Sequence, residues 1–481
     1  MVCIRHKFTA HPVGQGLFYS GRISLTNDGY DEHFNFVFDC GSMNKKQCED
    51  EINNYHTNIF PDNSALDLLV ISHFDEDHVN HIYELLKSNR KAKKIVAPLL
   101  NFTERFSLLL KWLSSGGNKS LASGEFFFIQ LILDPDTTLT TLLDGDGGEI
   151  IYITSDPDNP SFPLADSENK ITEEGQNLKF TLDFGQKQVM PKDRKDSILA
   201  TESIGNAKTI SDSNRPTLRL GAVSIMEFLF YKKEIGTNES ELYDELYRLF
   251  IAQYKKYFTN PERPTIVEIT EIVKQIKTAT PVKKLFKEAQ NNLKFTTFKN
   301  VNIEDLNTTA LCLLHRNTRH QETQGLFNKR RYFHREMKAY TIQKFEHLTL
   351  PFSRTLVPLN PQYRYHINNT NPNVFLTSDS FLLRLTDVDA LYKRYKNYWD
   401  DYWLFQVPHH GSNNNADVTL FSRIPPDTEL FINYGVVKAW GGKWRHPSSQ
   451  VITDIISTGH SINVSPVHEY LGLEFEYILF R

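Results

Sequence analysis

The stretch Leu68-Leu69-Val70-Ile71-Ser72-His73-Phe74-Asp75-Glu76-Asp77-His78 decides which fold we expect for this chain. Its apolar start predicts a short buried strand, and a hexad rich in potential metal ligands follows almost at once. Side chains at positions one, three, five and six of a hexad cannot all point the same way from a helix or a strand, but a loop at the end of a sheet can converge them. The candidate ligands for one or two cations are His73, Asp75, Asp77 and His78. The alternative is a solvated acidic loop with incidental histidines, which the strand directly before it disfavours. His81, one turn beyond, is expected to be exposed.

Strands and turns recur on both sides of this stretch. Apolar spacing predicts a helix over 79–86, and Ile95-Val96-Ala97-Pro98 predicts another buried strand, which gives an α/β unit. Later apolar runs predict strands at 310–314, 374–377, 403–407 and 430–434. Three of these runs are followed by residues that suit a site: Asp379, His409-His410-Gly411-Ser412 and His446. Because strand ends share one edge of a sheet, distant segments can assemble one site there.

Composition limits the class of protein without choosing a function. A chain of 481 residues with 40% hydrophobic residues can bury a large core in one decorated domain or in two. The net charge of −4 neither requires nor excludes a nucleic-acid partner. Four cysteines without CxxC spacing disfavour a disulfide scaffold and a cysteine zinc site. With no visible signal peptide or membrane span, we expect a soluble, cytoplasmic protein with no membrane partner.

The chain divides into three parts by pattern. Residues 1–100 and 301–481 are rich in strands and ligands, and we expect them to form the two halves of one domain. Residues 101–300 are mixed, with polar turns, short strand candidates at 178–182 and 222–231, and helical periodicity over 239–291. We expect this middle part to be a large, partly helical insertion that lies near the site as a lid or as a surface for a protein partner.

The hexad also carries a family resemblance. His73-Phe74-Asp75-Glu76-Asp77-His78 resembles a variant of the His-x-His-x-Asp-His signature of the metallo-β-lactamase superfamily. Four further segments occur in the order that this family shows: Val13-Gly14-Gln15-Gly16, Phe38-Asp39-Cys40-Gly41, Leu376-Thr377-Ser378-Asp379 and Val407-Pro408-His409-His410-Gly411-Ser412. Together with His446-Pro447-Ser448, they are most similar to the branch that contains the hydrolase-like domain of the bacterial competence DNA-uptake channel.

The resemblance implies a role for each matching residue. His73 and Asp75 would hold one ion, Asp77 and His78 the other, with Asp379 between them and His410 as the last ligand. Asp39 would support the histidine loop by hydrogen bonding, while His409, Asn307, Ser412 and His446 would line the substrate site. Two departures matter: Asp75 replaces a histidine, and Asn307 stands where a histidine ligand is common. They leave open one or two divalent ions, manganese or zinc, with magnesium as a further option.

The fold implied by the resemblance is a four-layer αβ/βα sandwich of the α/β (α+β) class. The implied chemistry is hydrolysis by a metal-activated water, with Asp77 or Asp379 orienting the water and His446 assisting. Our first functional hypothesis is a phosphodiesterase or nuclease. The alternatives are a hydrolase of a small molecule, such as a cyclic nucleotide, a lactone or a thioester, and a weakly active regulatory subunit of a multi-protein system.

Two basic segments bear on a nucleic-acid or phosphodiester substrate. One contains Arg316, Arg319, Lys329, Arg330, Arg331, Arg335 and Lys338 among aromatic residues, and the other contains Lys87, Arg90, Lys91, Lys93 and Lys94. Such segments could follow a phosphate backbone. For a run of charges alone, a solvated surface is the better interpretation, by about two to one.

Overall fold

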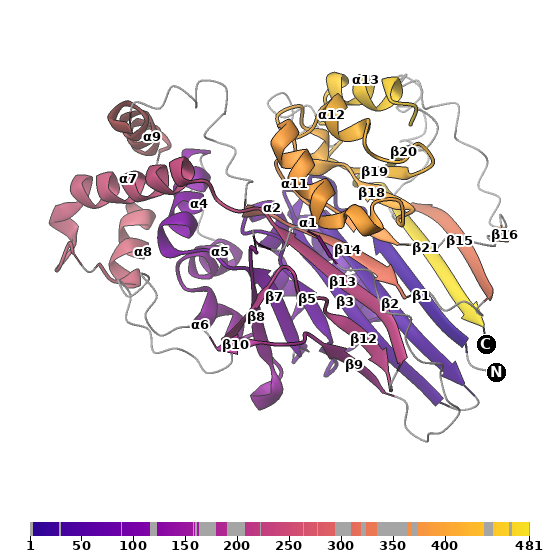
Figure 1. The fold of residues 1–481 in the computed structure, drawn as a ribbon. Helices are drawn as coiled ribbons and strands as arrows, with labels where there is room; N and C mark the ends of the chain where they lie inside the picture. Colours follow the sequence, from indigo (N-terminus) through magenta and orange to yellow (C-terminus); the bar gives the residue numbers. More distant parts are fainter. Residues whose placement is uncertain are drawn as a thin grey trace.

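A computed structural model places most of the chain. It describes residues 3–27, 30–87, 89–115, 123–156, 158, 161–162, 179–189, 207–221, 223–262, 264–276, 278–293, 309–318, 324–333, 364–366, 373–436, 446–460 and 464–480. Over these ranges the fold is mixed α/β, with two large sheets that lie face to face and helices on the outer side of each (Figure 1).

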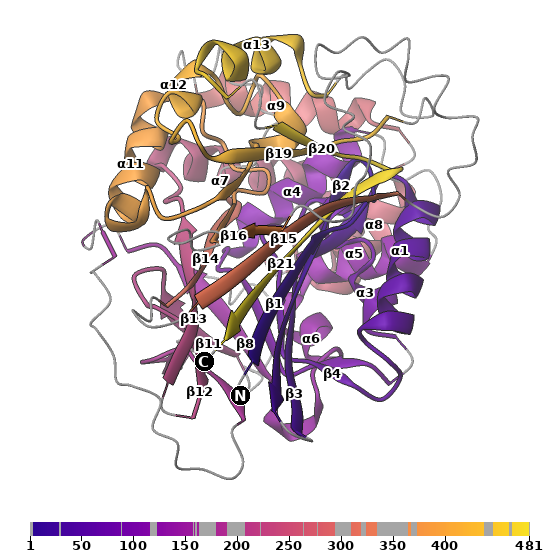
Figure 2. The same ribbon diagram turned by 90° about the vertical axis from the view of Figure 1, so that its right-hand side faces the viewer.

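The first sheet has eleven strands within the described residues, in the order β10-β11-β8-β7-β5-β3-β2-β1-β21-β15-β16. Its strands are β1 (Cys3–Ala10), β2 (Gly16–Asn27), β3 (Tyr30–Ser42), β5 (Leu68–Val70), β7 (Lys94–Pro98), β8 (Glu149–Thr154), β10 (Gln188–Val189), β11 (Ala207–Ser211), β15 (Gln324–Phe333), β16 (Arg364–His366) and β21 (Leu471–Phe480). The strands β1, β2, β3 and β21 run side by side (Figure 2). From β3 to β11 all neighbours are parallel, so β5 ends at the same edge as β3 and β7.

The second sheet has eight strands within the described residues, in the order β20-β19-β18-β17-β14-β13-β12-β9. Its strands are β9 (Phe180–Asp183), β12 (Thr217–Leu220), β13 (Val223–Lys232), β14 (Leu311–Asn317), β17 (Val374–Leu376), β18 (Leu404–Gln406), β19 (Glu429–Asn433) and β20 (Val464–Val467). The last four are parallel to one another, so the chain leaves β17 and β18 at one edge. A separate two-stranded sheet pairs β4 (Ala65–Leu66) with β6 (Lys91–Ala92).

Aromatic rings fill the space between the two large sheets. Phe36 of β3 packs edge-on against Phe228 of β13, with ring centroids 5.2 Å apart. The ring of Phe8 of β1 packs at a tilt of 38° against His315 of β14, with ring centroids 4.6 Å apart. All four side chains are fully buried. Since strands alternate their side chains between two faces, the other residues of β3, β5 and β7 are free to pack outward against helices.

Helices cover the outer face of each large sheet. The first sheet packs against α1 (Lys45–Asn58), α2 (Glu76–Val79), α3 (Ile82–Leu85), α4 (Phe102–Ser114), α5 (Ser123–Leu133) and α6 (Pro135–Thr140), and α7 (Thr237–Gln253), α8 (Ile266–Gln275) and α9 (Thr280–Leu293) extend that core. The second sheet packs against α11 (Leu385–Tyr395), α12 (Val418–Phe421) and α13 (Ser449–Ser457). Short 3-10 turns lie at η1 (Gly145–Gly147), η2 (Lys255–Tyr257), η6 (Lys396–Tyr398) and η7 (Pro408–Gly411). Among the helices described here, none has both the length and the apolar character needed to cross a bilayer.

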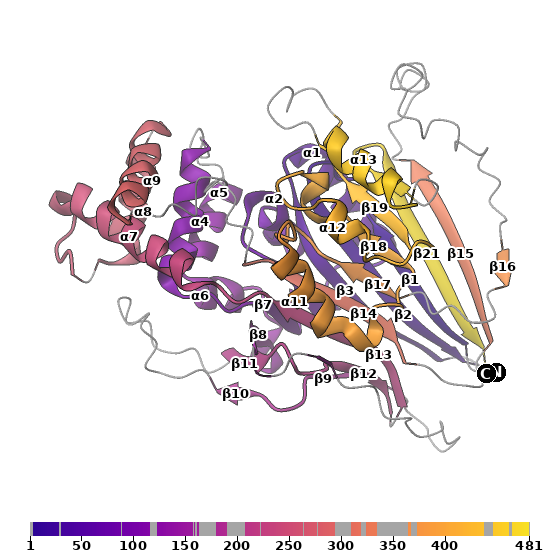
Figure 3. The same cartoon turned by 45° about the horizontal axis from the view of Figure 1, so that its top comes forward.

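The middle part of the chain differs from the expected insertion 101–300. The strand candidates near 178–182 and 222–231 are confirmed as β9 and β13, and the helical prediction over 239–291 is confirmed by α7, α8 and α9. However, β8, β11, β12 and β13 are strands of the two large sheets. Among the described residues of this stretch, the helices lie outside both sheets, and α4, α5, α7, α8 and α9 gather on one side of the molecule (Figures 1 and 3). The run Glu149–Thr154, apolar at its centre, is a strand that the sequence analysis missed because polar turns surround it.

The single helix expected over 79–86 is two short helices, α2 and α3, interrupted at Asn80 and His81. Hydrogen bonds from the side chain of Asn80 and the backbone of His81 to the end of β3 cause this interruption. Asn80 Oδ1 accepts from the Ser42 N–H at 3.0 Å, and Asn80 Nδ2 donates to the Ser42 carbonyl at 2.9 Å. The His81 N–H donates to the Cys40 carbonyl at 3.1 Å. These bonds compete with helical ones and fix the connection between α2 and α3 against the end of β3.

Phe228→Ala tests the packing between the sheets. Removing a fully buried phenyl ring leaves a cavity, and such truncations typically cost about 3–5 kcal/mol of unfolding free energy. We expect a large drop in the urea concentration at the midpoint of unfolding, measured by tryptophan fluorescence. Val267→Ala, at a side chain that is 71% exposed on α8, is the control and should change stability by less than about 0.5 kcal/mol. Equal effects of the two substitutions would contradict the face-to-face packing.

Candidate metal centre

Three strand ends bring the predicted ligands to one place between the sheets. The chain leaves β5 at Val70 and runs through residues 71–75 into α2, and we call residues 71–79 the ligand loop. It leaves β17 at Leu376 and reaches Asp379 three residues later, and it leaves β18 at Gln406 and enters η7, which contains His409 and His410. The Leu311 N–H of β14 donates to the Ser72 carbonyl at 2.8 Å, which ties the second sheet to the ligand loop.

Asp379 lies at the centre of the histidines, and its two carboxylate oxygens face different partners. Oδ1 is 3.2 Å from His78 Nε2 and 3.7 Å from His410 Nε2. Oδ2 is 3.4 Å from His409 Nε2 and 3.9 Å from His73 Nε2. The carboxylate therefore separates two groups of donors, as expected for the residue between two ion positions.

The first group consists of His73, Asp75 and Asp379, whose ligand atoms all lie within 4.8 Å of one another. His73 Nε2 is 3.9 Å from Asp75 Oδ2. The second group consists of Asp77, His78 and His410, again within 4.8 Å, with His410 Nε2 at 3.4 Å from Asp77 Oδ2. Donors on a tetrahedral ion at about 2.1 Å are about 3.4 Å apart, so both groups have spacings close to those of a metal site.

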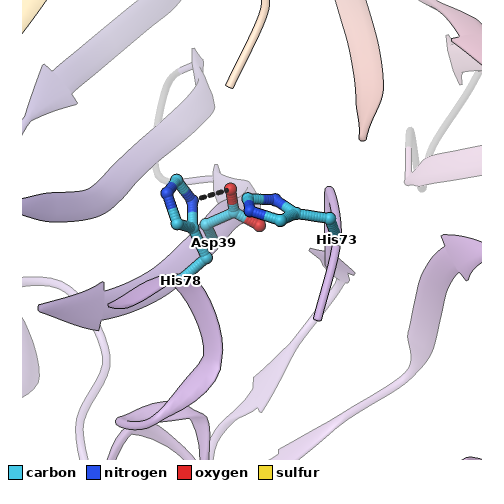
Figure 4. Close-up of side chains that lie close together, drawn as sticks. All are labelled: Asp39, His73 and His78. Carbon is cyan, nitrogen blue, oxygen red and sulfur yellow. Dashed lines mark hydrogen bonds and ion pairs between the residues drawn. The ribbon is translucent and has the colours of Figure 1, made fainter. Parts of the chain in front are cut away.

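Asp39 completes a third close group with His73 and His78, but its oxygens are already engaged. Asp39 Oδ1 accepts from the Ser72 N–H at 2.7 Å, and Oδ2 accepts from the Ser72 hydroxyl at 2.5 Å and the Ser378 hydroxyl at 3.1 Å. Oδ2 also accepts from His78 Nδ1 at 2.9 Å, and Figure 4 shows this contact with the His73 ring beside it. Asp39 thus supports the ligand loop and His78 by hydrogen bonding, which is the role that the resemblance implies.

Hydrogen bonds donated by Nδ1 orient the imidazoles of His73, His78 and His410. His78 donates to Asp39, and His410 Nδ1 donates to the Asn433 carbonyl at 2.8 Å. Because the Ser72 hydroxyl donates to Asp39, it accepts from His73 Nδ1 at 2.8 Å. The Nε2 atoms of His73, His78 and His410 are buried and have no hydrogen-bond partner among the described residues. Buried imidazole nitrogens left in this way beside carboxylates fit a cation, which would satisfy them.

In the centre, burial and neighbouring charges act in opposite directions on the carboxylate pKa values. Burial opposes ionisation of Asp379, but the imidazoles of His409, His78 and His410 hold its pKa well below the usual range. Burial likewise opposes ionisation of Asp77, yet the neighbouring imidazoles of His410 and His78 lower its pKa. Burial lowers the pKa of His73, and the neighbouring His78 adds to the effect. Asp77 and Asp379 are therefore kept ionised next to the imidazoles.

The backbone at the centre is held in strained conformations. Asp39, Ser378, His409 and His410 have φ values of 56°, 49°, 46° and 57°. Residues other than glycine rarely adopt this left-handed region, and each such residue costs of order 1–3 kcal/mol. Gly41 allows the ligand loop to approach β3, because a Cβ at that position would lie 2.6 Å from the carbonyl carbon of His78.

The remaining predicted residues have different surroundings. His409 Nδ1 donates to Asn415 Oδ1 at 2.6 Å, which directs Nε2 toward Asp379 and places His409 with the first group. His446 lies beside both histidines of η7, with ring centroids 5.8 Å from His409 and 6.4 Å from His410. Ser412 is buried, and its hydroxyl accepts a hydrogen bond from the Asn414 N–H at 3.2 Å, so it shapes the loop.

Asn307 lies outside the described residues. His81 is buried, and the expectation that it is exposed is wrong.

Two residues of α4 that were not predicted from the sequence contact the ligand loop. Lys111 Nζ is 2.7 Å from Asp75 Oδ2, and Trp112 Nε1 donates to Glu76 Oε2 at 2.8 Å. These contacts also place part of the expected insertion next to the centre. A signal existed: Lys111 is a lone charge in the apolar run Leu108-Leu109-Leu110-Lys111-Trp112-Leu113.

The basic side chains of the two segments that the structure describes are bonded to acidic side chains or to a backbone carbonyl and do not point unpaired at the centre. Arg316 is buried and pairs with Glu227 and Asp401, so a nucleic-acid contact through it is wrong. Lys87, Arg90, Lys93 and Lys94 pair with Glu84, Asp62, Asp67 and Glu149, and Lys91 Nζ donates to the Thr141 carbonyl. For Lys329, Arg330 and Arg331 the structure gives only the backbone of β15, and Arg319, Arg335 and Lys338 lie outside the described residues.

Comparison with known proteins adds no further assignment: no protein-family model and no curated protein matches this chain.

Asp39→Asn tests the support of the histidine loop. The amide keeps the shape but loses the charge and one acceptor for His78 Nδ1, so we expect Mn²⁺ affinity to fall by about 10–100-fold in isothermal titration calorimetry. Asp67→Asn, at a carboxylate that pairs with Lys93 instead, is the matched control and should keep wild-type affinity. An unchanged affinity in Asp39→Asn would rule out this role.

Gly41→Ala tests the close approach of β3 to the ligand loop. A methyl group 2.6 Å from a backbone carbon forces the loop to move, and we expect a loss of about 1–3 kcal/mol in stability together with weaker Mn²⁺ binding. At Gly147 a Cβ would meet nothing within 4 Å, so Gly147→Ala is the control. If Gly41→Ala melts and binds Mn²⁺ like Gly147→Ala, the loop does not depend on this contact.

Proposed function

We propose that this chain is a metal-dependent hydrolase of the metallo-β-lactamase type that cleaves phosphodiester bonds. The observation that carries the proposal is the position of Asp379, whose two oxygens face His78 and His410 on one side and His73 and His409 on the other. These residues come from segments some three hundred positions apart. The two face-to-face sheets with helices outside, and the motifs at the strand ends, agree with what the resemblance implies.

The two donor groups define where ions would bind. His73, Asp75 and Asp379 form the first position, and Asp77, His78, His410 and Asp379 form the second. A divalent cation bound there would polarise a substrate oxygen and offset the negative charge of the transition state. Because three of the donors are aspartates, the set favours manganese or magnesium over zinc.

The residues of the chain itself supply orientation and hydrogen bonding. Asp77 and Asp379 stay ionised, so their carboxylates can accept the hydrogen bonds that orient an attacking water. Burial, reinforced by His410 and His409, lowers the pKa of His446 to about 3. His446 is therefore neutral at neutral pH, and its ring N–H can donate a hydrogen bond to a phosphoryl oxygen or to the leaving oxygen.

The paired basic residues bear on the size of the substrate. A long polyanion needs unpaired basic side chains along its path, and Arg316 and the segment 87–94 do not provide them. This observation favours, as the second candidate, hydrolysis of a small molecule such as a cyclic nucleotide. Both candidates use the same centre.

A substrate panel with site variants tests the proposal. Wild-type protein with Mn²⁺ should cleave labelled single-stranded DNA or small phosphodiesters. His78→Ala and Asp379→Ala should each lower the cleavage rate by more than about 100-fold. This loss exceeds the effect of about 10–100-fold that is typical of losing a residue that only supports a ligand. Cleavage of DNA that fails above about 0.3 M salt would indicate contacts to the phosphate backbone.

The matched control is His33→Ala, at a partly exposed histidine of β3 that pairs with Asp31 away from the centre. It should keep the wild-type rate. Activity that survives in His78→Ala and Asp379→Ala with their folds intact would overturn the proposal. A folded wild-type protein with no hydrolysis on the whole panel would instead favour the regulatory subunit.

A further inference from the structure

The first donor group already has a positive charge beside it. Lys111 Nζ lies 2.7 Å from Asp75 Oδ2, the same oxygen that is 3.9 Å from His73 Nε2. Both partners are largely withdrawn from water, with 15% of the Lys111 side chain and 17% of the Asp75 side chain exposed. An ion pair this close and this shielded is stronger than one on the open surface.

The helix α4 is anchored so that Lys111 stays at this place. Asn101 and Glu104 form a capping box that fixes the start of α4. Next to Lys111, Trp112 Nε1 donates to Glu76 Oε2 at 2.8 Å, so two adjacent residues of α4 hold two adjacent residues of the ligand loop. The rest of the helix is anchored by burial, since Leu109, Leu110 and Leu113 belong to the core. The ammonium is thus a built part of the centre.

The two donor groups differ in how many ligand atoms they have available for a divalent ion. The second group has Asp77, His78 and His410 together with Asp379 Oδ1. The first group has to share Asp75 with Lys111, and a divalent ion on Asp75 would stand a few ångströms from the ammonium, where like charges repel.

We propose that the Lys111 ammonium takes the place of the ion in the first donor group, so that the chain holds one divalent ion, bound by Asp77, His78, His410 and Asp379. This inference rests on the proposed metal centre. Lys111 is then an internal cation that balances the charge of Asp75. The ammonium on one side of Asp379 and a single metal ion on the other provide the positive charge that two metal ions would otherwise provide.

The number of bound ions tests the inference without any assay of activity. After equilibrium dialysis against Mn²⁺, elemental analysis should find about one ion per chain in the wild type. Lys111→Met frees Asp75 and should raise the number to about two, while Lys111→Arg keeps the charge and should leave it at about one. Lys93→Met removes another lysine at 2.7 Å from an aspartate, remote from the centre, and should also leave about one.

Asp75→Asn gives a second test that does not depend on the folding of Lys111→Met. Because Asp75 does not hold the ion in this account, Asp75→Asn should still bind about one. Two ions in the wild type, one in folded Lys111→Met, or none in folded Asp75→Asn would each overturn the role of Lys111. No bound ion in the wild type would overturn the metal centre as well, so the two failures are distinguishable.

Discussion

The structure depends on one fully buried carboxylate, that of Asp39, at the place where the two large sheets meet. A buried charge is costly unless it is well bonded, and Asp39 accepts hydrogen bonds from Ser72 after β5, from Ser378 after β17 and from His78 of α2. These partners are separated by some three hundred residues, so this carboxylate links the two halves of the chain. It also fixes Nδ1 of His78 and, through the Ser72 hydroxyl, that of His73, which leaves both Nε2 atoms directed at Asp379.

The arrangement around Asp379 follows from that link. Once the ligand loop is fixed by Asp39, the parallel strands β17 and β18 deliver Asp379 and η7 to the same edge. The left-handed conformations of Asp39, Ser378, His409 and His410 show that the fold maintains unfavourable backbone geometry at this edge. Strain concentrated at one place, together with buried imidazole nitrogens that lack partners among the described residues, is typical of a functional site. Lys111 adds a positive charge from a helix outside both sheets.

Much of this was predictable from local sequence, and the rest was not. The strands at 68–71, 95–98, 310–314, 374–377, 403–407 and 430–434 were predicted because each is a short apolar run before a turn, and all are confirmed to within a few residues. His73, Asp75, Asp77, His78, Asp379 and His410 were predicted as neighbours because strand ends share an edge. The break between α2 and α3 depends on bonds from Asn80 and His81 to β3, and the Lys111 contact depends on how α4 packs. Such tertiary contacts leave no periodic signal in the sequence.

The most direct test of the account is anomalous X-ray diffraction from crystals of the chain grown with Mn²⁺. We predict a manganese peak within coordinating distance of Asp379 and His410, which follow strands of the second sheet, and of Asp77 and His78, from the ligand loop. A map with no peak at these four side chains, or with manganese bound only elsewhere on the molecule, would contradict the claim that the two halves of the chain bind a metal ion jointly.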